Sequence, residues 1–166
     1  MPKLEVFFDY ACPYCLRGHE SLLALLPQYP QVEIEWFPCE AHPRPGRYGP
    51  HSDLCARGMY FALEHGADLM AYHDKMYCAA LKNRSDIEDL RVLSRLADDL
   101  LDPDAFYAAL SDRSYLDRLL ENNRLAWEIY RFPAVPSYRM KGNLLKSIED
   151  IGVSKQQLAA FIEKNL

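Results

Sequence analysis

Hydrophobic and polar residues alternate in two short segments near the N-terminus, and the segment between these two has the periodicity of a helix. Residues 4–8 alternate until a second consecutive phenylalanine interrupts the pattern, which predicts a short, largely buried strand. Residues 16–26 carry leucines at helical spacing and are followed by two prolines, which predicts a helix that ends there. Residues 32–36 alternate apolar side chains with glutamates and predict a second strand. The first part of the chain therefore reads as strand, helix, strand.

The middle of the chain has helical periodicity throughout. A loop rich in proline and glycine over residues 38–50 precedes it. Ser85-Asp86-Ile87-Glu88 matches a capping box, and Asp102-Pro103 places a proline at the first position of a helix. The pattern predicts helices over residues 52–63, 68–81 and 85–101, one beginning at residue 103, and a long last helix that reaches residue 130.

The C-terminal part returns to strand patterning. Residues 137–140 and 144–146 read as two strands joined by a tight turn at Gly142-Asn143, and Ser154 to Gln157 matches a capping box before a final helix. A strand–helix–strand unit favours parallel pairing and a hairpin is antiparallel, so we expect an α/β fold with one mixed sheet. We expect residues 1–50 and 131–166 to form this domain, with residues 51–130 as an all-helical insertion.

Composition excludes several classes of protein. The chain has 166 residues, 49% of them hydrophobic, which suits a single domain with a sizeable core. The net charge of -5 comes without a basic block, so we expect neither nucleic acid nor a membrane surface as a partner. The chain enters its first strand without a signal-peptide pattern, so we expect a cytoplasmic protein. The sequence leaves open whether it forms a homodimer.

Cys12 and Cys15 flank the turn between the first strand and the first helix. Residues three apart share one face of a helix, close enough to form a disulfide. A thiol at a helix N-terminus meets unpaired N–H groups and the positive end of the helix dipole, which favour the reactive thiolate. The pattern predicts a thiol–disulfide redox site in which Cys12 is the nucleophile and Cys15 the resolving thiol.

The turn alone supports two further interpretations. Cys12 and Cys15 could be half of a zinc site completed by His19 and Cys39, although a second close Cys/His pair is missing, and we expect no metal. Cys-Pro-Tyr-Cys is also the turn of glutaredoxins, which lack a helical insertion. The remaining cysteines, Cys55 and Cys78, fall within predicted helices and are expected to be small buried side chains.

Two segments carry a resemblance to a known family. Residues 7–15, Phe-Phe-Asp-Tyr-Ala-Cys-Pro-Tyr-Cys, and residues 134–138, Ala-Val-Pro-Ser-Tyr, resemble the thioredoxin fold of the DsbA-like family. The helical insertion and residues 40–43 are similar to its FrnE branch, which is related to 2-hydroxychromene-2-carboxylate isomerases and kappa-class glutathione transferases. The resemblance implies that Pro136 is cis and faces the redox turn, and that the backbone of Val135 pairs with an extended substrate.

The same resemblance extends the expected site beyond the thiols. It places Pro13 and Tyr14 beside the sulfurs and the loop that carries His42 near the active face. We therefore expect Pro13, Tyr14, His42, Val135 and Pro136 to contact substrate. The expected partners are thiols and disulfides of proteins or small molecules, with no bound cofactor and with glutathione open as a co-substrate.

The sequence departs from the family pattern at three positions. Ala134 replaces the usual glycine before Val-Pro, and Val6 stands where thioredoxin has a buried acid, so that Asp9 is the nearest substitute. Arg139 is a charge in a strand that is usually apolar. We expect a DsbA-like protein disulfide oxidoreductase. The rival hypotheses are a glutathione-dependent isomerase or transferase, and a zinc-binding or client-binding module without turnover.

Overall fold

The computed structural model describes residues 1–166 and divides them into two compact units. Met1–Ala41 and Asn122–Leu166 form the first unit, and His42–Glu121 form the second. The boundaries predicted from the sequence were residues 50/51 and 130/131, so both observed boundaries lie earlier in the chain. Asn122 explains part of this difference, because its side-chain amide donates to the carbonyl of Pro38 and holds the end of a helix against a strand of the first unit.

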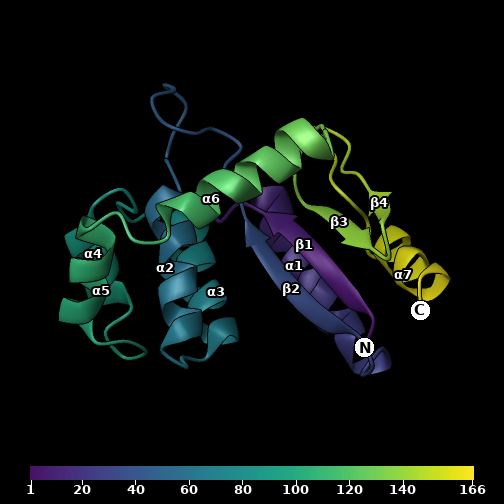
Figure 1. Cartoon of the computed structure of the whole chain (residues 1–166), viewed down its shortest axis with the longest axis horizontal. Helices are drawn as coiled ribbons and strands as arrows, with labels where there is room; N and C mark the ends of the chain where they lie inside the picture. The colour runs from purple at the N-terminus through teal and green to yellow at the C-terminus, as the bar shows by residue number, and fades with distance from the viewer. The chain divides into compact units, whose positions relative to one another are not determined.

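A four-stranded mixed sheet forms the centre of the first unit (Figure 1). Its strands are β1 (Lys3–Phe8), β2 (Glu33–Pro38), β3 (Ser137–Met140) and β4 (Asn143–Leu145). The strand order is β2-β1-β3-β4, in which β1 runs parallel to β2 and antiparallel to β3. The predicted α/β fold with a mixed sheet is confirmed, and β1 lies between strands from both ends of the chain.

The side chains of β1 alternate between the two faces of the sheet. Val6 pairs with Trp36 and Tyr138, and these three side chains share one face. Phe7 lies on the other face, where its ring stacks on Phe37 at 4.7 Å. Val6 is 5% exposed, so the position at which thioredoxin has a buried acid is an ordinary core position in this chain.

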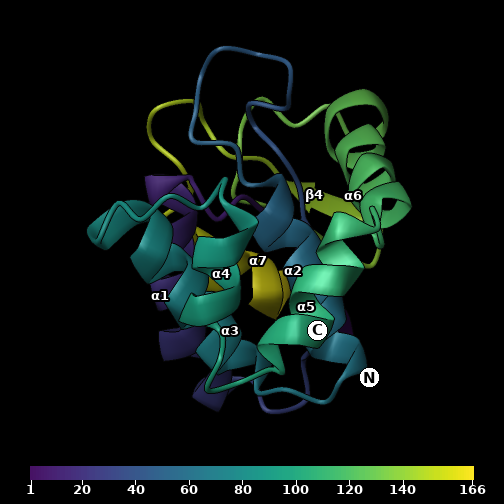
Figure 2. The ribbon, with the colours of Figure 1, turned by 90° about the vertical axis from the view of Figure 1, so that its left-hand side faces the viewer.

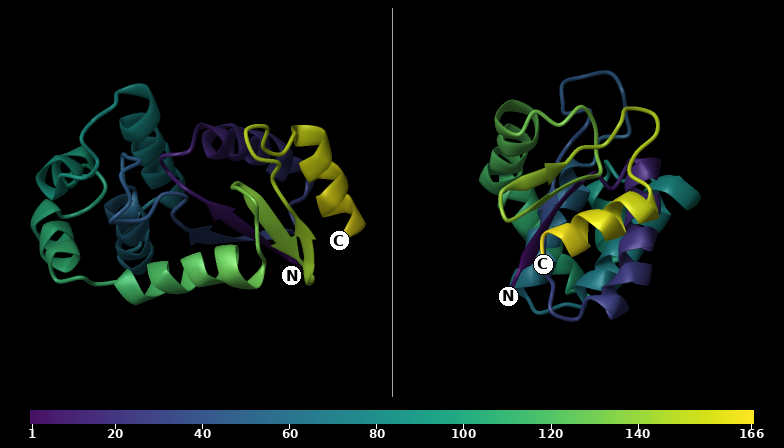
Figure 3. Two further views of the ribbon diagram at one scale, coloured as in Figure 1. Left: turned by 90° about the horizontal axis from the view of Figure 1, so that it is seen from above. Right: turned by 90° about the vertical axis from the view of Figure 1, so that its right-hand side faces the viewer.

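Helices cover both faces of this sheet. The first unit contains α1 (Pro13–Leu25), followed by a 3-10 turn over Leu26–Gln28, and α7 (Lys155–Lys164). Helices α1 and α7 pack together on one side of the sheet, while the C-terminal end of α6 (Leu116–Asn123) and its π-helical continuation, Arg124–Ile129, lie on the other (Figure 3). The capping box at Ser154 is confirmed, because its hydroxyl accepts the amide of Gln157 while the Gln157 side chain accepts the amide of Ser154.

The second unit is helical, as predicted (Figure 2). Its helices are α2 (Asp53–Glu64), α3 (Leu69–Tyr77) with a π-helical end at Cys78–Lys82, α4 (Leu90–Leu96), α5 (Pro103–Ser111) and the beginning of α6. Phe61 and Phe106 meet edge to face at 5.5 Å in its core. Arg57, 6% exposed, donates to the carbonyl of Leu110 in the last turn of α5 and to that of Ser114 beyond it, and so satisfies acceptors at the end of this helix. None of the helices in the chain is both long and apolar enough to span a membrane.

Two local predictions are wrong. Ser85 does not begin a helix, because Asp86 accepts the amide of Glu88 within a turn and α4 begins later, capped by Asp89. The β3–β4 turn is Lys141-Gly142 rather than Gly142-Asn143. Both turn residues have positive φ, as a two-residue hairpin with a type I′ turn requires, and this leaves Asn143 paired with Met140 in the ladder.

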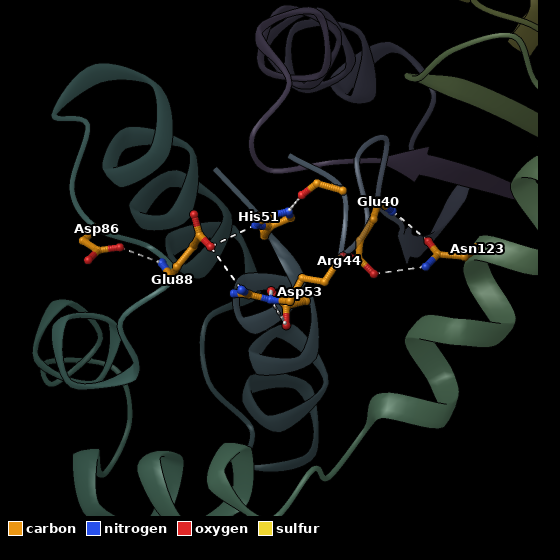
Figure 4. Close-up of polar contacts among 8 residues, drawn as sticks. Glu40, Arg44, His51, Asp53, Asp86, Glu88 and Asn123 are labelled. Carbon is orange, nitrogen blue, oxygen red and sulfur yellow. Dashed lines mark hydrogen bonds and ion pairs between the residues drawn. The ribbon is translucent and has the colours of Figure 1, made fainter. Parts of the chain in front are cut away.

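A polar cluster organises the proline-rich loop at the start of the second unit (Figure 4). The Arg44 guanidinium contacts Asp53 and Glu88, in both cases at 3.2 Å. His51 contacts Glu88 Oε1 through Nδ1 at 2.9 Å and the Gly46 carbonyl through Nε2 at 2.8 Å. Side chains therefore tie the loop to the first turn of α2 and to the segment before α4.

Candidate active site

The turn between β1 and α1 holds the two cysteines of the predicted redox site. Cys12 is the N-cap of α1 with extended backbone dihedrals, and Pro13 occupies the first turn, where a missing N–H costs no hydrogen bond. The amides of Cys15 and Leu16 both donate to the Cys12 carbonyl, at 3.1 and 3.2 Å. The helix begins immediately after Cys12, so its thiol lies at the N-terminal end, as the spacing predicted.

The two thiols occupy unlike environments. Both are free thiols, and Cys12 is partly exposed while Cys15 is 1% exposed. A hydrogen bond from the Cys15 side chain, opposed by partial burial, lowers the pKa of Cys12. Burial raises the pKa of Cys15 well above its ordinary value, and its hydrogen bond to Cys12 adds to the effect. One accessible thiol thus favours the thiolate, and its buried neighbour favours the protonated form.

The Val135–Pro136 pair meets this turn from the far end of the sequence. The Cys12 Sγ lies 3.6 Å from the Val135 carbonyl oxygen, to which it donates. The peptide bond between Val135 and Pro136 is cis. Both residues are buried, and β3 begins directly after them. The antiparallel pairing of β3 with β1 carries this pair to the strand end from which the cysteine turn leaves.

Tyr14 lies in the first turn of α1, between the two cysteines in the chain, and its ring faces Arg17 and Gly152. The Arg17 guanidinium lies 5.1 Å from the centre of the Tyr14 ring, and Gly152 lies beneath the ring, where a Cβ atom would be 3.5 Å away. A pocket of about 250 Å³ opens between α1 and the segment that leads into α7. Its lining consists of Tyr14, Arg17 and Ser21 from α1, together with Ile151 and five further residues up to Gln157. Pro13 is exposed at the start of the helix.

A third thiol lies near the pair; from the sequence it was a candidate zinc ligand or a partner in a second disulfide, and in the structure it is a free thiol. Cys39 is fully buried, and its Sγ donates to the Phe8 carbonyl at 3.5 Å. Burial raises the pKa of Cys39, and the charges of Asp9 and Cys12 raise it further. No sequence spacing connects Cys39 with the turn. The parallel pairing of β2 with β1 places it there, because Pro38 is the register partner of Phe8.

The remaining candidates lie in other surroundings. His42 is exposed in the second unit, with its ring centre 5.6 Å from that of Tyr48, and contact of His42 with substrate stays a prediction. His19 is buried beside Trp36, with ring centres 5.8 Å apart. Nowhere in the chain do three His, Cys, Asp or Glu side chains come together in a way that could hold a metal ion. Cys55 is buried in α2 as expected, whereas Cys78 is partly exposed.

Comparison with known proteins points in one direction. The model of the DSBA-like thioredoxin domain family matches residues 3–159. No curated protein sequence matches the chain. A probable DsbA oxidoreductase from Streptomyces coelicolor superposes with a TM-score of 0.82 at 17% identity, covering 99% of this chain and 90% of that one. A thioredoxin-like oxidoreductase from Silicibacter pomeroyi gives a TM-score of 0.71 at 22% identity, with 98% and 85% coverage. DsbA from Pseudomonas aeruginosa superposes with a TM-score of 0.73 at 15% identity, covering 98% of this chain and 85% of that one.

Proposed function

Because the chain belongs to the DSBA-like thioredoxin domain family, we propose that it is a thiol–disulfide oxidoreductase that acts through Cys12 and Cys15. The observation that carries the proposal is the contrast between the two thiols. Cys12 is accessible and has a lowered pKa, whereas Cys15 is buried and has a raised one. Nucleophilic attack needs an exposed thiolate, and resolution needs a second thiol within reach that does not compete for substrate.

The proposed exchange balances over two steps. The Cys12 thiolate attacks one sulfur of a substrate disulfide, a Cys12–substrate disulfide forms, and the other substrate sulfur leaves as a thiolate that takes up a proton. The Cys15 thiol then loses its proton and attacks the Cys12 sulfur, so that the Cys12–Cys15 disulfide forms and the second substrate thiol is released. Two electrons and two protons pass to the substrate. The reverse sequence donates the disulfide, and neither direction needs a bound cofactor.

We infer that Val135, Pro136, Pro13 and Tyr14 receive the substrate. The Val135 carbonyl already lies within reach of the Cys12 sulfur, and its backbone offers an extended peptide hydrogen bonds of the kind used in strand addition. Pro136 has no N–H, so it cannot continue such a ladder. Pro13 is exposed and Tyr14 partly exposed directly after Cys12, so both side chains are available to a bound substrate. The substrates that suit this surface are protein segments or small molecules that carry a disulfide, with glutathione as a candidate small thiol.

We place the chain in the FrnE branch of the family. The supporting residues are the segment from Phe7 to Cys15 and the segment 40–43, both of which resemble that branch. The related isomerases and transferases typically carry serine at the position of Cys12, so the presence of both cysteines favours disulfide exchange. No feature of the site gives specific support to the isomerase or transferase alternative.

The proposal is tested by dithiothreitol-dependent reduction of a protein disulfide. We expect Cys12→Ala to abolish activity and Cys15→Ala to accumulate a mixed disulfide that mass spectrometry detects as an adduct on Cys12. Cys78→Ala removes a partly exposed thiol from the helical unit and serves as the matched control, with wild-type activity expected. Wild-type rates in both Cys12→Ala and Cys15→Ala would overturn the proposal.

A further inference from the structure

Asp9 is a buried acid that makes three hydrogen bonds to the cysteine turn. It follows β1 directly and is 5% exposed. Its carbonyl accepts the amide of Cys12 at 3.1 Å, and its own amide donates to the Cys15 sulfur at 3.4 Å. Its carboxylate oxygen Oδ1 accepts the amide of Ala11 at 2.8 Å. The residue therefore holds the path of the turn through both its backbone and its side chain.

The second carboxylate oxygen reaches a different segment. Oδ2 of Asp9 accepts the amide of Ala41 at 2.9 Å, just beyond the end of β2. That segment is itself anchored, because Glu40 exchanges hydrogen bonds with Asn123, whose side chain accepts the Glu40 amide at 2.8 Å and donates to Glu40 Oε1 at 3.1 Å (Figure 4). The indole of Trp127 also donates to the Glu40 carbonyl, at 2.9 Å. Asp9 thus bridges the cysteine turn to a segment that a helix holds in place.

This bridge also places a negative charge beside three thiols. The charge of Asp9 raises the pKa of Cys12, opposing the hydrogen bond from Cys15 that lowers it. The same charge raises the pKa of Cys15 and of Cys39, and the Glu40 carboxylate adds to the effect on Cys39. Repulsion between like charges is strongest where water is excluded. The Asp9 carboxylate therefore makes a thiolate at Cys12 or Cys15 less favourable.

We propose that Asp9 is a positioning residue for disulfide exchange: its carboxylate fixes the cysteine turn against the segment after β2, and its charge keeps the Cys12–Cys15 pair a weaker oxidant than an uncharged residue would. The inference rests on the proposed redox function. A disulfide carries no thiolate, so a negative charge destabilises the reduced form more than the oxidised form. Removing the charge stabilises the reduced form and makes the pair a stronger oxidant.

The test compares variants that separate charge from hydrogen bonding. Asp9→Asn removes the charge, and Asp9→Ser removes it while keeping an acceptor for the Ala11 amide. Asp9→Glu keeps the charge. Glu20→Gln removes an exposed acid from α1 and is the matched control. Two quantities are measured on each folded protein: the pKa of Cys12 from thiolate absorbance, and the equilibrium between dithiol and disulfide in a glutathione redox buffer.

We expect Asp9→Asn and Asp9→Ser to lower the pKa of Cys12 by about one unit and to shift the equilibrium about tenfold toward the dithiol, which corresponds to about 30 mV. Asp9→Glu is expected to stay closer to the wild type than either neutral variant, and Glu20→Gln to match the wild type. If Asp9→Asn does not fold, Asp9→Ser carries the same test.

The two proposals fail in different ways. A wild-type protein without disulfide exchange overturns the proposed function, whatever Asp9 does. A wild type that exchanges disulfides, with neutral Asp9 variants that leave both the pKa of Cys12 and the equilibrium unchanged, overturns the role of Asp9 alone. Equal shifts in Asp9→Glu and Asp9→Asn would also overturn it, because they would show that the charge is not the cause.

Discussion

Gly18 lies against Pro136, and nothing larger than a hydrogen atom fits between them. A Cβ atom at Gly18 would lie 2.9 Å from Pro136 Cγ and 2.9 Å from the hydroxyl oxygen of Tyr138. Gly18 is on the buried face of α1, one turn beyond Cys15, and Tyr138 is 1% exposed in β3. The helix that begins at the redox turn is thus seated directly on the Val135–Pro136 segment, and this contact requires glycine.

Gly18→Ala is expected to destabilise the protein and to slow disulfide exchange. Alanine would gain up to about 1 kcal/mol from helix propensity. Overpacking against a proline ring and a buried phenol costs about 1–3 kcal/mol and moves Pro136 relative to the Cys12 sulfur. Urea unfolding measures the net loss, and the exchange assay measures the rate. Ala24→Gly, the reverse change at an exposed position of the same helix, is the control and should lose only about 1 kcal/mol with an unchanged rate. A more stable Gly18→Ala would contradict the packing argument.

Features set by neighbouring residues were predictable from the sequence. The strand-to-helix turn at Cys12, the proline start of α5 and the capping box at Ser154 each depend on a few consecutive side chains. Ser85 shows the limit of this reasoning. It has the same capping-box spacing as Ser154, but Asp86 accepts the amide of Glu88 in a turn, and Ile87 in this turn is fully buried. Tertiary packing overrides local propensity there.

Contacts between distant parts of the chain could not be predicted in this way. Arg139 had no explanation in the sequence, because its partner depends on the register of β3 against β1. Cys39 reaches the neighbourhood of Cys12 through the register of β2. Asp9 was identified from the sequence as the nearest substitute for the buried acid of thioredoxin, but its hydrogen bond to Ala41 depends on where β2 ends. The sequence alone identified Cys12 and Cys15 as the candidate reactive thiols. The residues around them could be identified only from the pairing of the strands in the sheet.

The thiols are expected to react with iodoacetamide in a fixed order. The lowered pKa of Cys12 means that its thiolate forms at a lower pH than an ordinary thiol of pKa about 9, so it should be alkylated first at neutral pH. Cys15 and Cys39 are buried with raised pKa values and should react only after unfolding. Peptide mapping by mass spectrometry gives each rate. Cys78, which is partly exposed, is the reference thiol, and alkylation of Cys39 as fast as that of Cys12 would contradict the prediction.

Glu5 and Arg139 are expected to stabilise the sheet as a cross-strand pair. They are register partners in β1 and β3, and the Arg139 guanidinium donates to both Glu5 oxygens at 2.9 and 3.0 Å while lying over the Tyr130 ring. A double-mutant cycle with Glu5→Gln and Arg139→Met should give a coupling of roughly 0.2–1 kcal/mol that falls with added salt.

The same sheet offers a control for this coupling. Lys3 and Glu35 also form an ion pair between strands, but they lie diagonally, because the register partner of Lys3 is Glu33; their charged groups are 4.0 Å apart and about half of each side chain is exposed. An exposed pair of this kind contributes little, so its cycle should give a coupling near zero. Equal couplings for the two pairs would show that the shorter distance and greater burial of the Glu5–Arg139 pair have no effect.

His51 is expected to make the stability of the protein depend on pH. Glu88 Oε1 and the Gly46 carbonyl are both acceptors, so only the doubly protonated imidazolium can donate to both at once (Figure 4). The hydrogen bond to Glu88, followed by that to Gly46, raises the pKa of His51 above its ordinary value of 6.5, while the charge of Arg44 acts against them. Since the folded-state pKa is raised, the stabilisation is complete below about pH 6.5 and is lost as the pH rises through the folded-state pKa.

Urea unfolding of the wild type and His51→Gln from pH 5.5 to 8.5 measures this effect. Glu88 stays charged throughout, because His51 and Arg44 lower its pKa below 4.5. The stability difference between the two proteins should be largest at pH 5.5 and should shrink toward pH 8.5. In a Glu88→Gln background the imidazolium loses its carboxylate partner and keeps only the Gly46 carbonyl, so the pH dependence of the difference should become smaller. A difference that grows with pH would mean that neutral His51 holds the loop, with one of its two hydrogen bonds broken.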